Sequence, residues 1–191
     1  MPLDSESLLR LHDRSLQAWS RGEPEPDGRA ESLDALVLHV HHANYRIWKL
    51  EDEARRTDVP DAHIAEVKRQ IDRWNQRRCD LVERIDDLVL GEPAPARRAD
   101  AEQHSETIGM IVDRLSILAL KIHYAAEYAA RAATPELAAE CERRHQVLIE
   151  QRADLLACLT RLLAGIRTGR RYFKAYRQFK AYNDPRLRTS R

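Results

Sequence analysis

The positions of glycine and proline constrain this chain more than any other feature, because both residues interrupt regular secondary structure. Most of them gather at residues 22–28, 91–95 and 165–169, with isolated prolines at Pro60 and Pro135. The stretches between these breaks are too long for strands and long for ordinary helices, which average about 11 to 12 residues. We therefore expect four long helices, within residues 29–56, 61–90, 104–132 and 135–168.

Apolar residues within these stretches recur at steps of three and four, the spacing that places side chains on one face of a helix. The third stretch shows this with Ile108, Ile111, Val112 and Leu115. Thr134-Pro135 is typical of an N-cap followed by a first-turn proline, and Gly91 is a helix stop. Short connections make consecutive helices antiparallel. The predicted fold is all-α, an antiparallel up-down four-helix bundle.

We expect one domain over residues 1–191, since 43% of the residues are apolar and can form a full core. The predicted parts are a peripheral N-terminal helix, the four-helix core, a basic aromatic C-terminal helix and a flexible tail: residues 4–20, 29–168, 170–183 and 184–191. No apolar run approaches the roughly 18 residues of a membrane span, and the N-terminus lacks signal-peptide features. These observations predict a cytoplasmic protein without a membrane span.

Polar side chains interrupt the apolar stripes and need partners if they are buried. Residues equally distant from a helical turn lie at similar heights in an antiparallel hairpin. Comparing distances from the turns predicts two polar layers, with Asn75 and Ser116 between them. One layer contains His41, Arg78, Asp113 and Arg152, and the other contains Glu51, Lys68, His123 and His145.

Three interpretations of these layers remain open. They form a salt-bridge network that fixes helix register, a pocket for an anionic small molecule, or a metal site. Arginine presents a planar fork to phosphate or carboxylate, which favours the anion pocket. Its candidate residues are Arg78, Arg152, Asp113, Lys68, His41 and Asn75. The metal alternative would be an enzyme site resembling those of carboxylate-bridged di-metal bundles, and it would use Glu51, His123, Glu127, Glu142 and His145. Glu83 and Asp86 are a further candidate pair, for Mg²⁺.

The C-terminal segment concentrates positive charge, with nine Lys and Arg residues and one acidic residue over 167–191. Aromatic residues interleave with these charges, a pattern suited to anionic partners. The residues expected to contact such a partner are Lys174, Tyr176, Arg177, Lys180 and Tyr182. The competing interpretation, which we favour, is that Tyr172, Tyr176 and Phe179 dock on the acidic remainder of the chain.

Several motifs resemble a bacterial family known as domain of unknown function 4254. They include Trp48-x-x-Glu51-Asp52, Asn75-Gln76-x-Arg78-x-Asp80, Asp113-Arg114-Leu115-Ser116, Gln151-Arg152-x-Asp154 and Tyr182-Asn183-Asp184-Pro185. The resemblance covers about residues 33 to 187. It implies an all-helical cytoplasmic protein, often encoded near glycosyltransferases of surface-polysaccharide pathways, and it implies no particular activity. This chain departs from the family pattern at Lys121-Ile122-His123-Tyr124, where the histidine and tyrosine are exchanged.

The function we predict is binding of an anionic small molecule, such as a phosphorylated sugar or nucleotide, through the arginine and lysine layer. The alternatives are a metal-dependent enzyme and a structural adaptor without a ligand. The residues indicate no reaction and no cofactor. We do not expect a nucleic-acid partner, and homo-oligomerisation is left open.

Overall fold

A computed structural model describes residues 5–26 and 29–177, and in this part of the chain five helices carry almost all of the regular structure. The all-α class is therefore confirmed, with one small pair of strands added. The elements are α1 (Ser5–Ser20), α2 (Leu33–Glu53), α3 (Asp61–Leu90), β1 (Glu102–His104), α4 (Ile108–Ala130), α5 (Pro135–Arg167) and β2 (Arg171–Phe173). Within the described residues, no helix combines the length and apolar character that a membrane crossing requires.

Local sequence sets the ends of the long helices. Three of them begin at a hydroxyl N-cap, Ser32, Thr107 or Thr134, whose side chain accepts a hydrogen bond from the backbone N–H three residues further on. Each such cap satisfies a donor that the helix itself leaves unpaired. Pro135 occupies the first turn of α5, and Gly91 is the C-cap of α3, as predicted.

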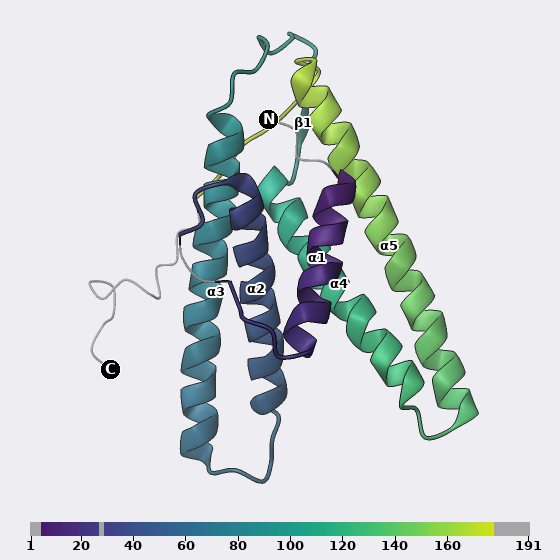
Figure 1. Ribbon diagram of the computed structural model, residues 1–191. Helices are drawn as coiled ribbons and strands as arrows, with labels where there is room; N and C mark the ends of the chain where they lie inside the picture. Colours follow the sequence, from purple (N-terminus) through teal and green to yellow (C-terminus); the bar gives the residue numbers. More distant parts are fainter. Residues whose placement is uncertain (1–4, 27–28, 178–191) are drawn as a thin grey trace, which may run out of the picture.

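The long helices form two hairpins, α2 with α3 and α4 with α5, each with antiparallel helices (Figure 1). The hairpins meet around the first half of α4 and diverge toward the loops at the other end (Figure 1). Helix α5 packs mainly on α4, while α4 also contacts α2 and α3. This arrangement shows the two hairpins but does not confirm a closed four-helix bundle.

Helix α1 lies between the two hairpins rather than outside them, and it contacts α4, α2 and α5 (Figure 1). One face of this helix is buried, through Leu8, His12, Leu16 and Trp19. Burying a large apolar side chain contributes about 1.5 to 3 kcal/mol. Helix α1 therefore fills part of the space that the diverging hairpins leave.

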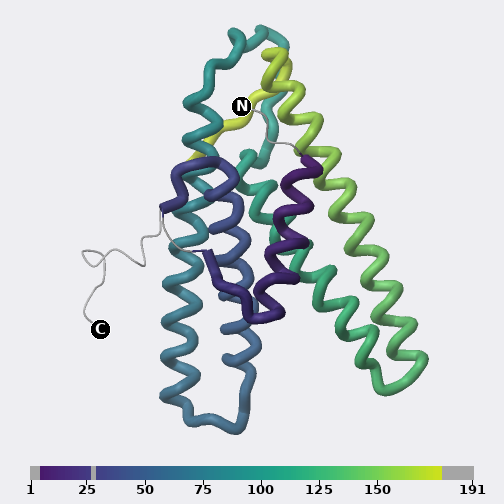
Figure 2. Tube along the Cα trace, in the orientation of Figure 1, coloured from purple at the N-terminus to yellow at the C-terminus, as the bar shows by residue number. Residues whose placement is uncertain are grey.

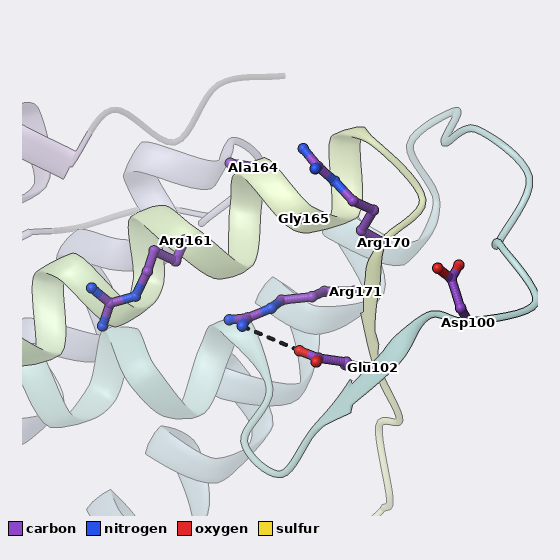
Figure 3. A pocket seen from close by; sticks show the side chains of 7 residues that line it. All are labelled: Asp100, Glu102, Arg161, Ala164, Gly165, Arg170 and Arg171. Carbon is purple, nitrogen blue, oxygen red and sulfur yellow. Dashed lines mark hydrogen bonds and ion pairs between the residues drawn. The ribbon is translucent and has the colours of Figure 1, made fainter.

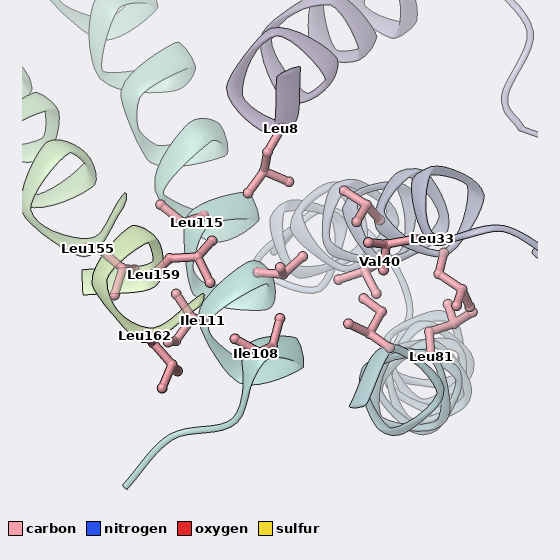
Figure 4. Packing of buried hydrophobic residues seen from close by; sticks show 14 of the residues in the cluster. Leu8, Leu33, Val40, Leu81, Ile108, Ile111, Leu115, Leu155, Leu159 and Leu162 are labelled. Atoms are coloured by element: carbon pink, nitrogen blue, oxygen red, sulfur yellow. The ribbon is translucent and has the colours of Figure 1, made fainter. Parts of the chain in front are cut away.

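The main apolar core lies where the hairpins meet (Figure 4). Helices α2, α3, α4 and α5 all supply it, for example through Val40, Leu81, Ile111 and Leu159 (Figure 4). Helices α3 and α4 approach each other closely at Gly109, where a Cβ would lie 2.4 Å from the carbonyl oxygen of Val82. Only glycine fits at this contact without a shift of one helix.

The two hairpins use corresponding positions for their shared core. His41 and Ser116 lie the same number of residues after the N-caps Ser32 and Thr107, and the two side chains are hydrogen-bonded to each other at 2.8 Å. Val40 and Leu115, the residues that precede them, are both fully buried. This correspondence is what two related hairpins packed face to face would produce.

The predicted C-terminal helix is wrong for the residues that the structure describes. Residues 171–173 form strand β2, which pairs in parallel with β1 and places Glu102 beside Arg171. Gly169, at φ +67°, turns the chain at the end of α5, and a Cβ there would meet the carbonyl oxygen of Ala96 at 2.6 Å. The turn breaks the helical period, so the basic aromatic segment continues as a strand.

The described part of the basic segment runs from the end of α5 toward α3 (Figure 2). Arg177 forms ion pairs there with Glu83, at 3.0 Å, and with Asp87. Phe173 is the buried aromatic residue, whereas Tyr176 is 74% exposed and does not dock as we expected. Phe179, Lys180, Tyr182 and the predicted tail 184–191 lie outside the described residues.

Candidate anion site

A chain of hydrogen bonds joins α2, α3 and α4, with the Asn44 side chain at its centre. The Asn44 amide nitrogen donates to Asp113 Oδ1 at 2.7 Å and to Ser116 Oγ at 3.0 Å. The Asn44 amide oxygen accepts from the Arg78 guanidinium at 3.2 Å. Both amide protons and the amide oxygen are therefore used, and Asn44 holds the three helices in one register.

The network also fixes the protonation of His41. Its Nε2 lies 3.1 Å from the carbonyl oxygen of His12, which can only accept, so Nε2 carries the proton. The unprotonated Nδ1 then accepts from the Ser116 hydroxyl at 2.8 Å. The hydroxyl oxygen of Ser116 accepts in turn from Asn44, which leaves every member of this chain with a consistent role.

Burial shapes the electrostatics of the network. It lowers the pKa of His41 to about 3, so the imidazole is neutral at physiological pH. Burial also raises the pKa of the Asp113 carboxyl, an effect that Arg78 and Asn44 oppose. Asp113 nevertheless lies 3.8 Å from Arg78 Nε, a long contact for an ion pair. The carboxylate therefore neutralises Arg78 only in part.

A cavity of about 220 Å³ adjoins the network between α2, α3 and α4. Arg78 and Asn44 belong to its wall, together with Trp48, Glu51, Asp52 and Arg55. The two acidic residues in this wall have partners of their own, because Glu51 pairs with Lys68 at 3.0 Å and Asp52 with Arg55 at 2.9 Å. Arg78 thus keeps spare donors at this wall, and 25% of its side chain is exposed.

Trp48 belongs to the same wall. Its ring stacks on Tyr124, with the ring centroids 5.0 Å apart. The indole N–H is buried, and the residues that the structure describes supply no hydrogen-bond acceptor for it. A buried donor without a partner is costly, but solvent does not reach this nitrogen, so a ligand in the cavity would contact it only after a local shift.

The structure brings Arg78, Asp113 and His41 into one network, but it places Arg152 elsewhere. Arg152 donates to both carboxylate oxygens of Asp13 on α1, at 2.7 and 3.4 Å. Helix α1 lies between the hairpins and supplies this partner. The comparison of heights used only the four long helices, so it did not include Asp13. Arg152 is therefore paired with Asp13 instead of Asp113. Asn75 is half-buried on α3, one turn before Arg78, and is not part of the hydrogen-bond chain described above.

The candidate metal ligands form local pairs instead of a cluster. Glu51 pairs with Lys68, His123 with Glu127 at 3.3 Å, and His145 with Glu142 at 3.6 Å. Among residues 5–26 and 29–177, no three His, Cys, Asp or Glu side chains are placed to hold a metal ion.

The Mg²⁺ candidate pair has structural roles. Asp86 accepts a hydrogen bond from the Gly109 backbone N–H at 2.7 Å at the start of α4, and Glu83 pairs with Arg177. A carboxylate at a helix N-terminus is favoured there by the helix dipole. These contacts explain both acidic residues without a metal.

A serine–histidine pair at the centre of the network raises the question of nucleophilic catalysis. Ser116 Oγ does donate to a neutral imidazole, which is the arrangement that activates a serine. However, both Ser116 and His41 are 0% exposed, and the hydroxyl oxygen already accepts from Asn44. No substrate carbonyl can reach this oxygen, so the pair serves packing and register.

The structure adds residues that the sequence alone did not single out. Asn44, the centre of the network, is not among the residues that the sequence predicts for the anion site, and Trp48 belongs only to the motif Trp48-x-x-Glu51. Asp13 gave no signal, because a charged residue on a short N-terminal helix is ordinarily solvated. Its role depends on where α1 packs.

Comparison with known protein families gives one match. Residues 34–175 match DUF4254, described as a protein of unknown function. The matched range includes Asn44, Arg78, Asp113 and Ser116, and it excludes helix α1. Searches of curated proteins and of solved structures found no match.

Proposed function

This chain belongs to DUF4254, a family of proteins of unknown function, and we propose that it binds a small anionic molecule in the cavity beside Arg78. The ligand class is a phosphate-bearing small molecule such as a sugar phosphate. The resemblance noted from the sequence implies a setting near glycosyltransferases of surface-polysaccharide pathways, where such molecules are precursors. A cytoplasmic protein would meet them there.

The observation that carries the proposal is the state of Arg78. Its guanidinium reaches the cavity wall with one hydrogen bond to Asn44 at 3.2 Å and a carboxylate no closer than 3.8 Å. A guanidinium has five N–H donors in a planar fork that matches phosphate or carboxylate. Asp113 and Asn44 hold this fork in place.

The size of the cavity limits the ligand. Sites for drug-sized molecules commonly enclose about 300 to 1,000 Å³. The cavity beside Arg78 measures about 220 Å³, which suits a phosphate group with a small part of the attached molecule. The remainder of a larger ligand would extend past Arg55 at the exposed side of the cavity.

The test compares the same conservative change at two arginines. Arg78→Lys keeps a positive charge near Asp113 but removes the planar guanidinium fork. Arg152→Lys makes the identical change on α5, where Arg152 pairs with Asp13 of α1. Melting curves are recorded for wild type and both variants with and without millimolar sugar phosphates at constant ionic strength. A ligand that binds only the folded state raises the melting temperature.

We expect a rise for wild type and Arg152→Lys and a much smaller one for Arg78→Lys. An equal rise in all three proteins would place binding outside the cavity, and no rise in wild type would refute the proposal.

The alternative function, a structural adaptor without a ligand, is favoured by a different observation. His41, Asn44 and Ser116 are almost completely buried, and their hydrogen bonds to one another, Asp113, Arg78 and the His12 carbonyl need no ligand. A network of this kind is sufficient to fix the register of α2 against α4. If wild type shows no ligand response while Asn44→Ala unfolds readily, the adaptor is the better description.

A further inference from the structure

A second basic pocket lies at the end of α5, where the chain turns into β2 (Figure 3). It has a volume of about 410 Å³, and three arginines, Arg161, Arg170 and Arg171, contribute to its wall. Asp100 and Glu102 lie on the side formed by the segment that leads into β1 (Figure 3). We propose that this pocket is a separate binding site for the phosphate or diphosphate group of a small molecule.

The first support for this site is the balance of charge. The Asp100 carboxylate accepts two hydrogen bonds from Arg98, both at 2.9 Å, and Glu102 pairs with Arg171 at 3.3 Å. Both acidic residues of the pocket are thus neutralised by arginines.

Arg161 and Arg170 are the cations left over. The Arg161 guanidinium donates to the Cys158 sulfur at 3.1 Å, and the Arg170 guanidinium donates to the Thr168 hydroxyl, also at 3.1 Å. Within residues 5–26 and 29–177 neither guanidinium forms an ion pair with a carboxylate, although Arg170 is near enough to Asp100 to help Arg98 lower the pKa of that carboxyl. The pocket therefore carries positive charge that the protein itself does not compensate.

The second support is the backbone geometry that positions Arg171 in this pocket. Gly165 of α5 lies directly beneath Arg171, and a Cβ at Gly165 would lie 2.7 Å from the Arg171 Cβ and Cγ. The absence of a side chain lets the Arg171 stem cross the helix closely. Gly169 makes the turn, and the pairing of Glu102 with Arg171 in the parallel ribbon fixes the strand register.

In the resulting arrangement the Arg161 and Arg171 guanidinium groups extend in the same direction, and Asp100 lies at the opposite end of the pocket (Figure 3). Arginine forks on adjacent elements can bind separate oxygens of one phosphate, and each such hydrogen bond is charge-assisted. The volume of about 410 Å³ falls within the range of ligand sites and exceeds that of the Arg78 cavity. A diphosphate with part of an attached group therefore fits this pocket better than a single small anion.

This site does not depend on the proposed function of the Arg78 cavity. The residues of the two sites do not overlap: one is built from α2, α3 and α4, and the other from the end of α5 with β2 and the segment before β1. Strand β1 and the C-terminal end of α5 are nearer to the start of α2 than to its end (Figure 1), whereas the Arg78 cavity is lined by residues of the second half of α2. Substitutions at one site can therefore be used to isolate the other.

The experiment is calorimetric titration of the full chain with inorganic pyrophosphate at constant ionic strength. The variants are Arg161→Gln, Arg170→Gln and the double substitution. Arg143→Gln is the matched control, because Arg143 is an exposed arginine on the same helix outside the pocket. Arg78→Lys is titrated as well, to separate the two sites. The replaced side chains are exposed, so far-UV circular dichroism should show every variant folded.

We expect wild type to bind pyrophosphate and the double variant to bind at least roughly tenfold more weakly, because charge-assisted hydrogen bonds commonly contribute that much. The affinity of each single variant for pyrophosphate should lie between those of wild type and the double variant. Arg143→Gln and Arg78→Lys should still bind pyrophosphate at this site. The proposal is overturned if wild type does not bind at millimolar pyrophosphate, if the double variant binds like wild type, or if Arg143→Gln weakens binding equally. Loss of all binding in Arg78→Lys would overturn this site while leaving the Arg78 cavity supported.

Discussion

The buried imidazole of His41 should make the stability of this protein depend on pH. Burial lowers the pKa of His41 to about 3, whereas a histidine in an unfolded chain titrates near 6.5. Below pH 6.5 the unfolded chain therefore binds a proton that the folded chain does not. Falling pH then favours unfolding, and the stability contributed by neutral His41 is fully present only above pH 6.5.

The size of the effect follows from the two pKa values. One pKa unit corresponds to 1.36 kcal/mol. Between pH 7.5 and pH 5, where the folded protein still leaves His41 neutral, the free energy of unfolding should fall by about 2 kcal/mol through this residue alone. His12 acts in the same direction, since burial also lowers its pKa, while the raised pKa of Asp113 acts in the opposite direction.

The contribution of His41 can be isolated by comparing substitutions. His41→Gln keeps a donor for the His12 carbonyl but cannot titrate, and His63→Gln makes the same change at an exposed histidine. Urea unfolding followed by circular dichroism at pH 7.5 and pH 5 gives the free energies. The loss of stability between the two pH values should be about 2 kcal/mol smaller in His41→Gln than in wild type.

The control His63→Gln removes an exposed histidine that contacts Glu53 at 2.7 Å, and it should not reproduce the effect of His41→Gln. If His41→Gln and wild type lose equal amounts between pH 7.5 and pH 5, then His41 is not a buried neutral imidazole and the hydrogen-bond assignment of the network is wrong.

Three further predictions concern stability and are read from urea unfolding at pH 7.5. Gly109→Ala should destabilise the protein by about 1 to 3 kcal/mol, because its Cβ would lie 2.4 Å from the Val82 carbonyl oxygen; an unchanged midpoint would mean that α3 and α4 lie further apart. Asp113→Asn should cost about 1.5 to 3 kcal/mol, the range for a hydrogen bond to a charged group, and less than breaking a fully buried pair, since Arg78 is partly exposed. Phe173→Ala should cost about 3 to 5 kcal/mol, whereas Tyr176→Ala should be nearly silent, because Phe173 is 6% exposed and Tyr176 is 74% exposed; equal effects would contradict the docking of β2.

The sequence by itself determined the features that depend on neighbouring residues. Helix boundaries followed from hydroxyl caps such as Thr134 and from breakers such as Gly91, because capping hydrogen bonds form within one turn of the chain. The helical period placed His41, Arg78 and Asp113 on inward faces. Equal distances from the connection between α3 and α4 predicted that Arg78 lies near Asp113, and these two helices are in contact.

Only the tertiary structure decided which elements meet. Arg152 pairs with Asp13 because α1 lies between the hairpins, and no local pattern fixes where a short helix with one apolar face will pack. The segment after Gly169 carries a pattern compatible with a helix or a strand, and pairing with residues 102–104 selected the strand. Polar residues on the apolar helix faces could be recognised from the sequence. Their partners depended on how the two hairpins diverge, and packing between residues distant in the chain sets that divergence.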